Sequence, residues 1–272
     1  MLIDTHCHLD YDKFDADRAD VLLRARQAGV EHILIPATSL ENSRSVIALA
    51  ESAPMLSAAV GVHPTEARTW METSRPEEQL QQLARSHRCV LAVGEIGLDY
   101  YWDRDPHELQ RDVLQQQLGL AAELRLPVIL HFREKGDAPD GPCAADLLEI
   151  LRAWVDGLSS RDDPLANRPG VLHSFSGSLA TARRAIELGF LLGVTGPVTY
   201  RKERQDLIAA LPLASLLVET DGPFLSPQPW RGKRNEPAYV RLIADKIALL
   251  HQISPAQVAA VTTENAIQLF HW

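Results

Sequence analysis

The feature that most constrains this chain is a series of short apolar runs, each followed by a histidine or a carboxylate. Five of the ten histidines stand in such positions, and so do one glutamate and one aspartate. The runs read IDTHCHL (His6 and His8), VGVHP (His63), VGEIGLD (Glu95), VILHF (His131), VLHSF (His173) and VETDGPF (Asp221). Strands that direct imidazoles and carboxylates toward one point provide what a site for more than one metal ion needs.

Longer amphipathic segments separate the apolar runs, which is the pattern of repeated βα units in a parallel sheet. Strands are predicted at 2–5, 32–36, 56–62, 90–94, 127–130, 170–172, 190–194 and 216–219. Helices are predicted at 18–28, 42–51, 76–86, 108–125, 144–154, 179–188, 203–211, 237–250 and 255–270. A single TIM barrel, (β/α)8, commonly needs about 250 residues. The 272 residues therefore predict one barrel over 1–272, with a seven-stranded or distorted variant as the alternative and a surface insertion near 157–169.

In TIM barrels the active site is built at the carboxyl ends of the strands. His6 and His8 alternate along one strand, so both side chains share a face and can grip one ion. Glu95 has small neighbours and two carboxylate oxygens with which to bridge two cations. His131 and His173 are placed to hold a second ion, and Asp221 to complete the first. The other histidines precede strands or lie at helix ends, where structural roles are expected; these are His32, His87, His107, His251 and His271.

Composition sets weaker bounds on function. The three cysteines have no CxxC spacing, which argues against disulfides and a cysteine zinc site. The apolar runs are too short for a membrane span and no leader is evident, so a cytoplasmic protein is expected. A net charge of -9 disfavours a nucleic-acid partner. Two divalent cations would add about four positive charges, however, and a basic cluster of Arg231, Lys233 and Arg234 follows Asp221 in the sequence.

The ordered motifs resemble the TatD family of metal-dependent hydrolases over essentially the whole chain. They are DTHCHLD, GVHP, GEIGLDY, PVILHFRE, HSFSG, GVTGPVTY, ETDGPFLSP, GKRNEP and TTENAIQLF. The resemblance implies one ion held by His6, His8, Glu95 and Asp221, and a second held by Glu95, His131 and His173. It also implies hydrolysis of phosphodiester bonds in DNA, with 3′ to 5′ exonuclease action on single-stranded ends. Neither a membrane nor an obligate protein partner is expected.

Further residues are candidates for supporting roles. Asp221 and Glu95 are the expected catalytic carboxylates, with Asp221 orienting a water and taking its proton. Side chains expected to hold phosphate are His63, Arg133, Arg231, Lys233 and Arg234. Asp99 is expected to support a metal ligand and Asn235 to fix the basic loop. Tyr100, Tyr101 and Trp102 offer ring faces for unpaired bases. For the phosphate-holding and supporting residues the alternative is a solvated loop charge or a local cap, and for the three aromatic residues it is a cover on the barrel.

Two other functions fit the same residues. A metal-dependent hydrolase of small amides, lactones or esters would use the same water-activating centre. A noncatalytic metal-binding barrel is the third possibility, which the complete ligand set disfavours. The two ions are divalent, and mixed histidine and carboxylate ligands accept Mg, Mn, Zn, Fe or Ni.

Overall fold

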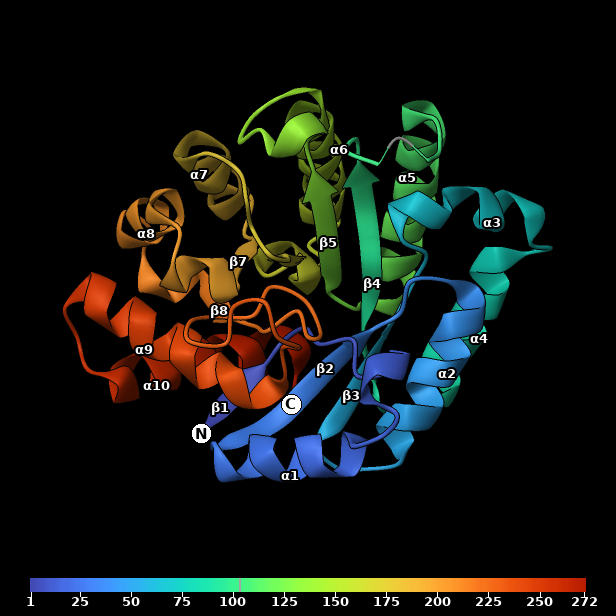
Figure 1. The fold of residues 1–272 in the computed structure, drawn as a ribbon. Helices are drawn as coiled ribbons and strands as arrows, with labels where there is room; N and C mark the ends of the chain where they lie inside the picture. The colour runs from blue at the N-terminus through green and yellow to red at the C-terminus, as the bar shows by residue number, and fades with distance from the viewer. Residues whose placement is uncertain (103) are drawn as a thin grey trace.

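The computed structural model describes residues 1–102 and 104–272 and shows eight parallel strands in the order β1 to β8. The strands are β1 (Leu2–Asp4), β2 (Val30–Pro36), β3 (Leu56–Val60), β4 (Val90–Asp99), β5 (Val128–Arg133), β6 (Gly170–Leu172), β7 (Leu191–Val194) and β8 (Leu216–Val218). β8 returns to β1, because the Thr5 N–H donates to the Val218 carbonyl and Cys7 forms a parallel bridge with Gly222. The sheet therefore curls into a nearly closed TIM barrel, as predicted (Figure 1).

Helices surround this barrel on the outside (Figure 1). They are α1 (Arg18–Gln27), α2 (Leu40–Glu51), α3 (Ala67–Glu72), α4 (Pro76–Ser86), α5 (His107–Leu124), α6 (Pro142–Ser159), α7 (Leu179–Glu187), α8 (Lys202–Ala209), α9 (Val240–His251) and α10 (Pro255–Phe270). Among the described residues, none of the helices combines the length and the apolar character needed to cross a membrane.

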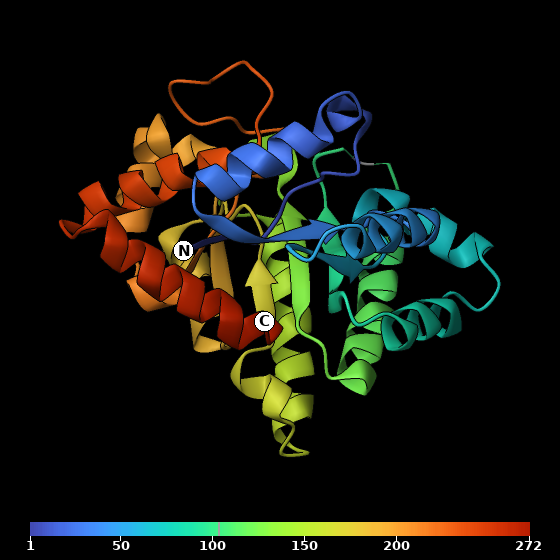
Figure 2. The same ribbon diagram turned by 90° about the horizontal axis from the view of Figure 1, so that it is seen from below.

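The barrel has an inner apolar layer to which each strand contributes one buried side chain. These side chains are Ile3, Leu34, Ala59, Ala92, Ile129, Val171, Leu191 and Leu217. The end of α10 joins the same cluster through Leu269 and Phe270, and Trp272 packs against it. Both views place the C-terminus close to the strands (Figures 1 and 2). The amino end of the barrel is thereby filled with apolar side chains.

A second apolar layer lies between the strands and the surrounding helices. Ile33 and Ile35 belong to this outer layer, whereas Leu34 between them faces the inner one, as the alternation of strand side chains requires. α2 shows how a helix joins the layer. The Ser39 side chain accepts a hydrogen bond from the Asn42 N–H and caps the helix, and Val46 lies among the buried residues of its inner face.

The structure extends two strands beyond the predicted ends. β4 reaches Asp99 and β5 reaches Arg133, because residues 96–99 of β4 pair with 130–133 of β5 after an irregularity in register between Val93 and Ile96. Gly97 permits this pairing, since its φ is +145° and a Cβ at this position would collide with the His131 carbonyl. Glu95 and His131 consequently lie within strands rather than after them.

Other differences lie in the connections. α3 was not predicted, and it forms in the loop after β3. α6 continues to Ser159, so it includes the beginning of the segment at 157–169 that was expected to be irregular. The rest of that segment contains a 3₁₀ turn at Pro164–Asn167, whose Leu165 is buried.

Candidate metal centre

The segments that follow β1 and β8 lie side by side at the carboxyl end of the barrel. The Asp221 N–H donates to the His6 carbonyl at 2.8 Å, and the His8 N–H donates to the Gly222 carbonyl at 2.7 Å. Asp221 adopts a left-handed conformation with φ of 55°, which aspartate tolerates better than most residues. Its Oδ1 consequently lies 3.9 Å from His6 Nε2 and 3.6 Å from His8 Nε2.

Glu95 joins this group through one of its two oxygens. Its Oε2 lies 3.5 Å from His6 Nε2 and 3.7 Å from His8 Nε2, and the two imidazole nitrogens are 3.3 Å apart. Ligands bound at about 2.1 Å with tetrahedral geometry lie about 3.4 Å from one another. The spacing of His6, His8 and Glu95 therefore fits a shared cation, as does that of His6, His173 and Asp221. Their donor atoms are those that transition metals prefer.

The other oxygen of Glu95 faces a second group of histidines. Glu95 Oε1 lies 2.9 Å from His131 Nδ1, 3.7 Å from His63 Nε2 and 3.8 Å from His173 Nε2. The two oxygens of Glu95 thus face different histidines, and its bridging of two cations stays a prediction. His63, expected to contact substrate, lies within this second group and has the donor chemistry to serve there as a ligand.

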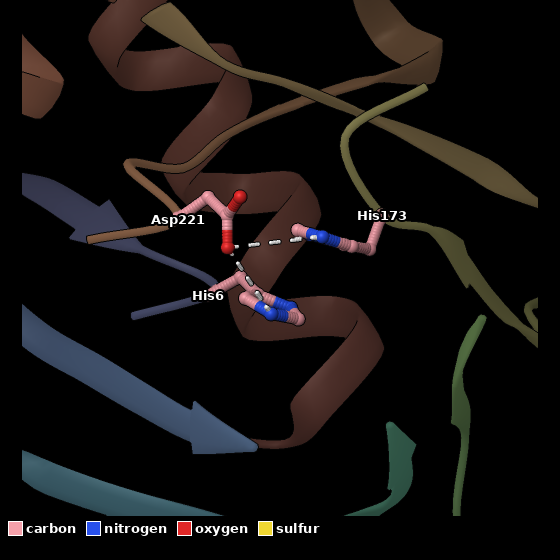
Figure 3. A group of neighbouring side chains, drawn as sticks. All are labelled: His6, His173 and Asp221. Carbon is pink, nitrogen blue, oxygen red and sulfur yellow. Dashed lines mark ion pairs between the residues drawn. The ribbon is translucent and has the colours of Figure 1, made fainter. Parts of the chain in front are cut away.

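His173 forms a group with His6 and Asp221 (Figure 3). Its Nε2 is 3.9 Å from Asp221 Oδ1, and its ring stacks on that of His6 with centroids 3.5 Å apart. Sequence reasoning placed His173 with Glu95 and His131, but the structure brings it equally close to Asp221.

Buried carboxylates hold the outer nitrogens of two of these histidines. Asp99 Oδ2 lies 3.0 Å from His131 Nε2, which is the supporting position expected for Asp99. Glu219 Oε1 lies 2.9 Å from His173 Nδ1, and Glu219 is fully buried. Such contacts fix the orientation of metal-binding imidazoles. Glu219 was not predicted, although its place two residues before Asp221 is a signal, because alternate residues of an extended chain share a face.

The charges in the centre favour a cation. Burial opposes ionisation of Glu95, but the interactions with the neighbouring histidines, His63, His173 and His6 among them, outweigh it and hold the pKa of Glu95 well below its usual range. Burial also opposes the protonated form of His131, yet hydrogen bonds with Asp99 and Glu95 raise the pKa of His131 to about 9. For His173, Glu219 and Glu95 overcome burial and raise the pKa to about 10. Protons thus balance the buried carboxylates here, and metal binding would displace them.

His6, His63 and Asp221 have pKa values that are shifted toward the neutral form. Burial, assisted by the charge of His173, lowers the pKa of His6 to about 4. Burial and His131 lower the pKa of His63 to about 3, so both rings are neutral and free to donate lone pairs. Burial raises the pKa of Asp221 to about 6 despite the nearby histidines.

The basic loop predicted to hold phosphate points elsewhere. Arg234 donates to both Asp17 oxygens at 2.7 Å. The Arg231 guanidinium lies 4.6 Å above the Tyr200 ring, and Lys233 Nζ lies 5.2 Å from the Trp230 ring centre. Phosphate binding by these three residues stays a prediction without support from their positions.

Asn235 does not act on the side chains of that loop. Its Nδ2 donates to the carbonyls of Thr220 and Phe224 at 2.7 Å. These bonds hold the segment that carries Asp221. Asn235 therefore holds the segment at the metal centre rather than the basic cluster that it was expected to fix.

A cavity of about 700 Å³ opens above the metal centre. Arg133 and Trp102, both predicted to contact substrate, line it, and Trp102 is 55% exposed. Arg133 Nε donates to Asp137 at 2.8 Å, and its guanidinium stacks 3.7 Å above Tyr101. Tyr100 is buried and stacked on a histidine, so it has no free ring face for a base. Cations of the cavity that sequence reasoning missed are Arg104, Arg201 and Arg204.

Comparison with known proteins agrees with this geometry. The model of the family described as TatD related DNase matches residues 3–271. The chain belongs to the TatD family. It is 40% identical over 272 residues to the uncharacterized metal-dependent hydrolase YjjV of Escherichia coli, covering 99% of this chain and 97% of that protein. The crystal structure of YjjV superimposes with a TM-score of 0.85 at 38% identity, covering 100% of this chain and 98% of that one.

A second TatD-family relative carries a more specific name. The protein named 3′-5′ ssDNA/RNA exonuclease TatD of Salmonella typhimurium is 33% identical, covering 99% of this chain and 98% of that protein. The chain described here is thus a TatD-family metal-dependent hydrolase whose buried histidines and carboxylates fit metal binding.

Proposed function

We propose that the protein is a metal-dependent phosphodiesterase that removes nucleotides from the 3′ ends of single-stranded DNA, with two divalent cations. The observation that carries the proposal is the position of Glu95, whose two oxygens face two different groups of histidines. Two-metal sites of this kind serve phosphodiester cleavage. The exonuclease name of the Salmonella relative supports the same substrate class.

His6, His8, Glu95 and Asp221 would hold one cation, and Glu95 with His131 and His173 the other, with His63 as a further donor. The chemistry that such ions supply is Lewis acidity toward the phosphoryl group and acidification of water. Asp221 turns Oδ1 toward the histidines. Its Oδ2 is then the oxygen that orients the attacking water and accepts its proton.

The cavity wall supports a nucleotide substrate. Trp102 and Phe224 both line the cavity and are 55% and 40% exposed, so each presents an aromatic face to which a base can stack. Arg133, already braced by Asp137, presents a guanidinium beside them. Unpaired bases can reach such rings, whereas bases stacked inside a duplex cannot.

The test is a substrate panel on chelator-treated protein, with Mg²⁺, Mn²⁺, Zn²⁺, Fe²⁺ or Ni²⁺ added back singly. Substrates are 5′-labelled single-stranded DNA, the same sequence as RNA, blunt duplex DNA and a small carboxylic ester. The expected result is a ladder of products shortened from the 3′ end, fastest on single-stranded DNA. Asp221→Asn should lower the rate at least about a hundredfold, which is the usual contribution of a general base.

The control is His87→Ala, because His87 follows α4, pairs with Glu51 at 2.7 Å and does not line the cavity. This variant should cleave like the wild type. Cleavage of the ester alone would favour the small-molecule hydrolase, and unchanged nuclease activity in Asp221→Asn would overturn the assignment of Asp221.

A further inference from the structure

Arg204 lies on α8, in the wall of the cavity above the metal centre. Its neighbours along this wall include Phe175, Val198 and Ile208, whose side chains are buried. Arg204 itself is half-buried. Arg204 is therefore a cation of the cavity lining that is partly withdrawn from solvent.

The other arginines of the cavity each have an acidic partner. Arg133 Nε is 2.8 Å from Asp137, Arg104 is 3.9 Å from Glu66, and Arg201 is 3.7 Å from Glu203. For Arg204, the part of the chain at 1–102 and 104–272 provides neither an ion pair nor a hydrogen bond to the guanidinium. Glu203 and Asp137 attract this charge without forming an ion pair with it. A partly desolvated guanidinium whose donors have no hydrogen-bond acceptor is unfavourable, so the residue is prepared for an anion that comes from outside the chain.

Burial and the charge of Arg201 lower the pKa of Arg204. A guanidinium nevertheless stays protonated at neutral pH. Arginine offers paired donors that match a phosphate, and such charge-assisted contacts are stronger than neutral ones. The floor of the cavity carries Glu95, Asp99 and Asp221, which repel phosphate unless cations neutralise them. Arg204 attracts phosphate at a position away from these three carboxylates.

We infer that Arg204 binds a phosphate of the substrate next to the one that is cleaved. The inference rests on the proposed function and adds a second phosphate site to it. Arg204 belongs to α8 and to none of the histidine and carboxylate groups around Glu95, so its phosphate is not the one at those groups. A substrate with two or more phosphates gains from this contact, whereas a small ester with one phosphate does not.

The experiment compares two substrates on the Mn²⁺-loaded protein, an eight-residue oligothymidylate and bis(p-nitrophenyl) phosphate. Arg204→Gln should raise the KM for the oligonucleotide about tenfold with little change in kcat, because it removes binding that ground state and transition state share. It should also reduce by about one the slope of log(kcat/KM) against log salt for the oligonucleotide. The rate with bis(p-nitrophenyl) phosphate should not change. Arg204→Lys should keep most of the oligonucleotide affinity.

Lys202→Ala is the matched control, because it removes one positive charge from the same helix. Lys202 is exposed and pairs with Asp206, outside the cavity wall. It should behave like the wild type with both substrates. Circular dichroism and the melting temperature of each variant establish that the comparison is between folded proteins, and Arg204→Lys tests the charge if Arg204→Gln is destabilised.

The outcomes separate the two proposals. A wild-type KM for the oligonucleotide in Arg204→Gln would overturn the inference and leave the nuclease proposal standing. Equal losses on both substrates would place Arg204 at the cleaved phosphate or in the fold, and would also overturn it. If the wild type does not cleave the oligonucleotide, the proposed function fails. Fluorescence anisotropy of the labelled oligothymidylate then decides the inference, which is overturned if wild type and Arg204→Gln bind it equally.

Discussion

At the scale of single residues, the metal centre depends on side chains that hold other side chains. Glu219 is fully buried, its Oε1 lies 2.9 Å from His173 Nδ1, and the same oxygen accepts a hydrogen bond from the Ser174 N–H. It therefore fixes the direction in which His173 Nε2 points. Removal of such a supporting carboxylate typically lowers the metal affinity by a factor of about 10–100.

This position provides the first prediction. Glu219→Gln should weaken metal binding about tenfold or more, because a neutral amide orients the imidazole less firmly and makes it less basic. Titration of metal-free protein with Zn²⁺ or Mn²⁺ by isothermal calorimetry measures the affinity. Glu187→Gln, which changes an exposed carboxylate at the end of α7, is the control. An affinity of Glu219→Gln equal to that of the control would contradict the supporting role.

The sequence predicted which side chains converge, because side chains at the carboxyl ends of neighbouring parallel strands must meet. The sequence did not predict where the side chains of loop residues point. Arg234 follows Asp221 closely in the chain, yet it turns to Asp17, and the intervening turn geometry carries no periodic signal. Arg204 was missed for a related reason. The hydrophobic periodicity of a surface helix such as α8 shows which side faces the core, but it does not show that a residue at the edge of this side lines a cavity.

At the scale of elements, one set of ion pairs ties α1 and the preceding Asp17 to residues 234–236. Asp17 receives hydrogen bonds from Arg234 and Arg24, and Arg24 also donates to both oxygens of Glu236 at 2.8 and 2.7 Å. Hydrogen bonds from Arg234, assisted by Arg24, lower the pKa of Asp17 from 3.8 to about 2. The stabilisation that follows is fully present above the unfolded pKa and is lost as pH falls through the folded one.

The second prediction concerns this pH range. Asp17→Asn should lower the free energy of unfolding at pH 7, and the difference from wild type should shrink between about pH 4 and pH 2, as Asp17 becomes protonated in the folded protein. Urea denaturation at several pH values measures it. Asp20→Asn, a nearby exposed position on α1, is the control and should match the wild type. A pH-independent difference would show that the ion pairs are not its cause.

The third prediction concerns α10 as the closure of the barrel. Phe270 is 1% exposed within the inner layer, so Phe270→Ala should destabilise the fold by about 3–5 kcal/mol through lost burial and a cavity. Leu249→Ala, at a side chain 74% exposed on α9, should change it by less than about 0.5 kcal/mol. Guanidinium denaturation compares the two. A loss in Phe270→Ala no larger than in Leu249→Ala would mean that α10 does not seal the barrel.

The element boundaries show the limit of pattern reasoning. All eight strands were predicted near their observed places, because each is a buried apolar run. The additional pairing of β4 and β5 was not, since GEIGLD contains two glycines and two acidic residues and reads as a turn. Only the neighbouring strand makes it extended, with Gly97 allowing the close approach to His131. α3 is short and follows a 3₁₀ turn, so it has little helical periodicity to detect.

At the scale of the whole molecule, the metal centre joins segments from both ends of the chain. His6 follows β1 and Asp221 follows β8, and Glu95 comes from β4 between them. A cation held by all three connects parts of the barrel that separate on unfolding. Ligands that bind the folded state alone stabilise it according to their concentration relative to Kd.

The fourth prediction follows from this linkage. Addition of Zn²⁺ or Mn²⁺ at about a hundredfold excess over Kd should raise the melting temperature of metal-free protein by roughly 5–10 °C. Differential scanning calorimetry measures the shift, and a chelator should reverse it. Glu95→Gln should show a much smaller shift, because Glu95 faces both groups. Equal shifts in wild type and Glu95→Gln would indicate binding at some other place.

The filled amino end of the barrel also determines how a polymer can use the cavity. Phe270 and Trp272 occupy that end, while the cavity opens at the other. A nucleic-acid strand cannot thread through the barrel. Its terminus enters a cavity that is closed at the far end, and each released monomer must leave by the entrance. Departure of the monomer and advance of the shortened strand therefore compete for one passage. Processive digestion would require contacts at the rim of the cavity that bind the nucleic-acid strand while the product leaves.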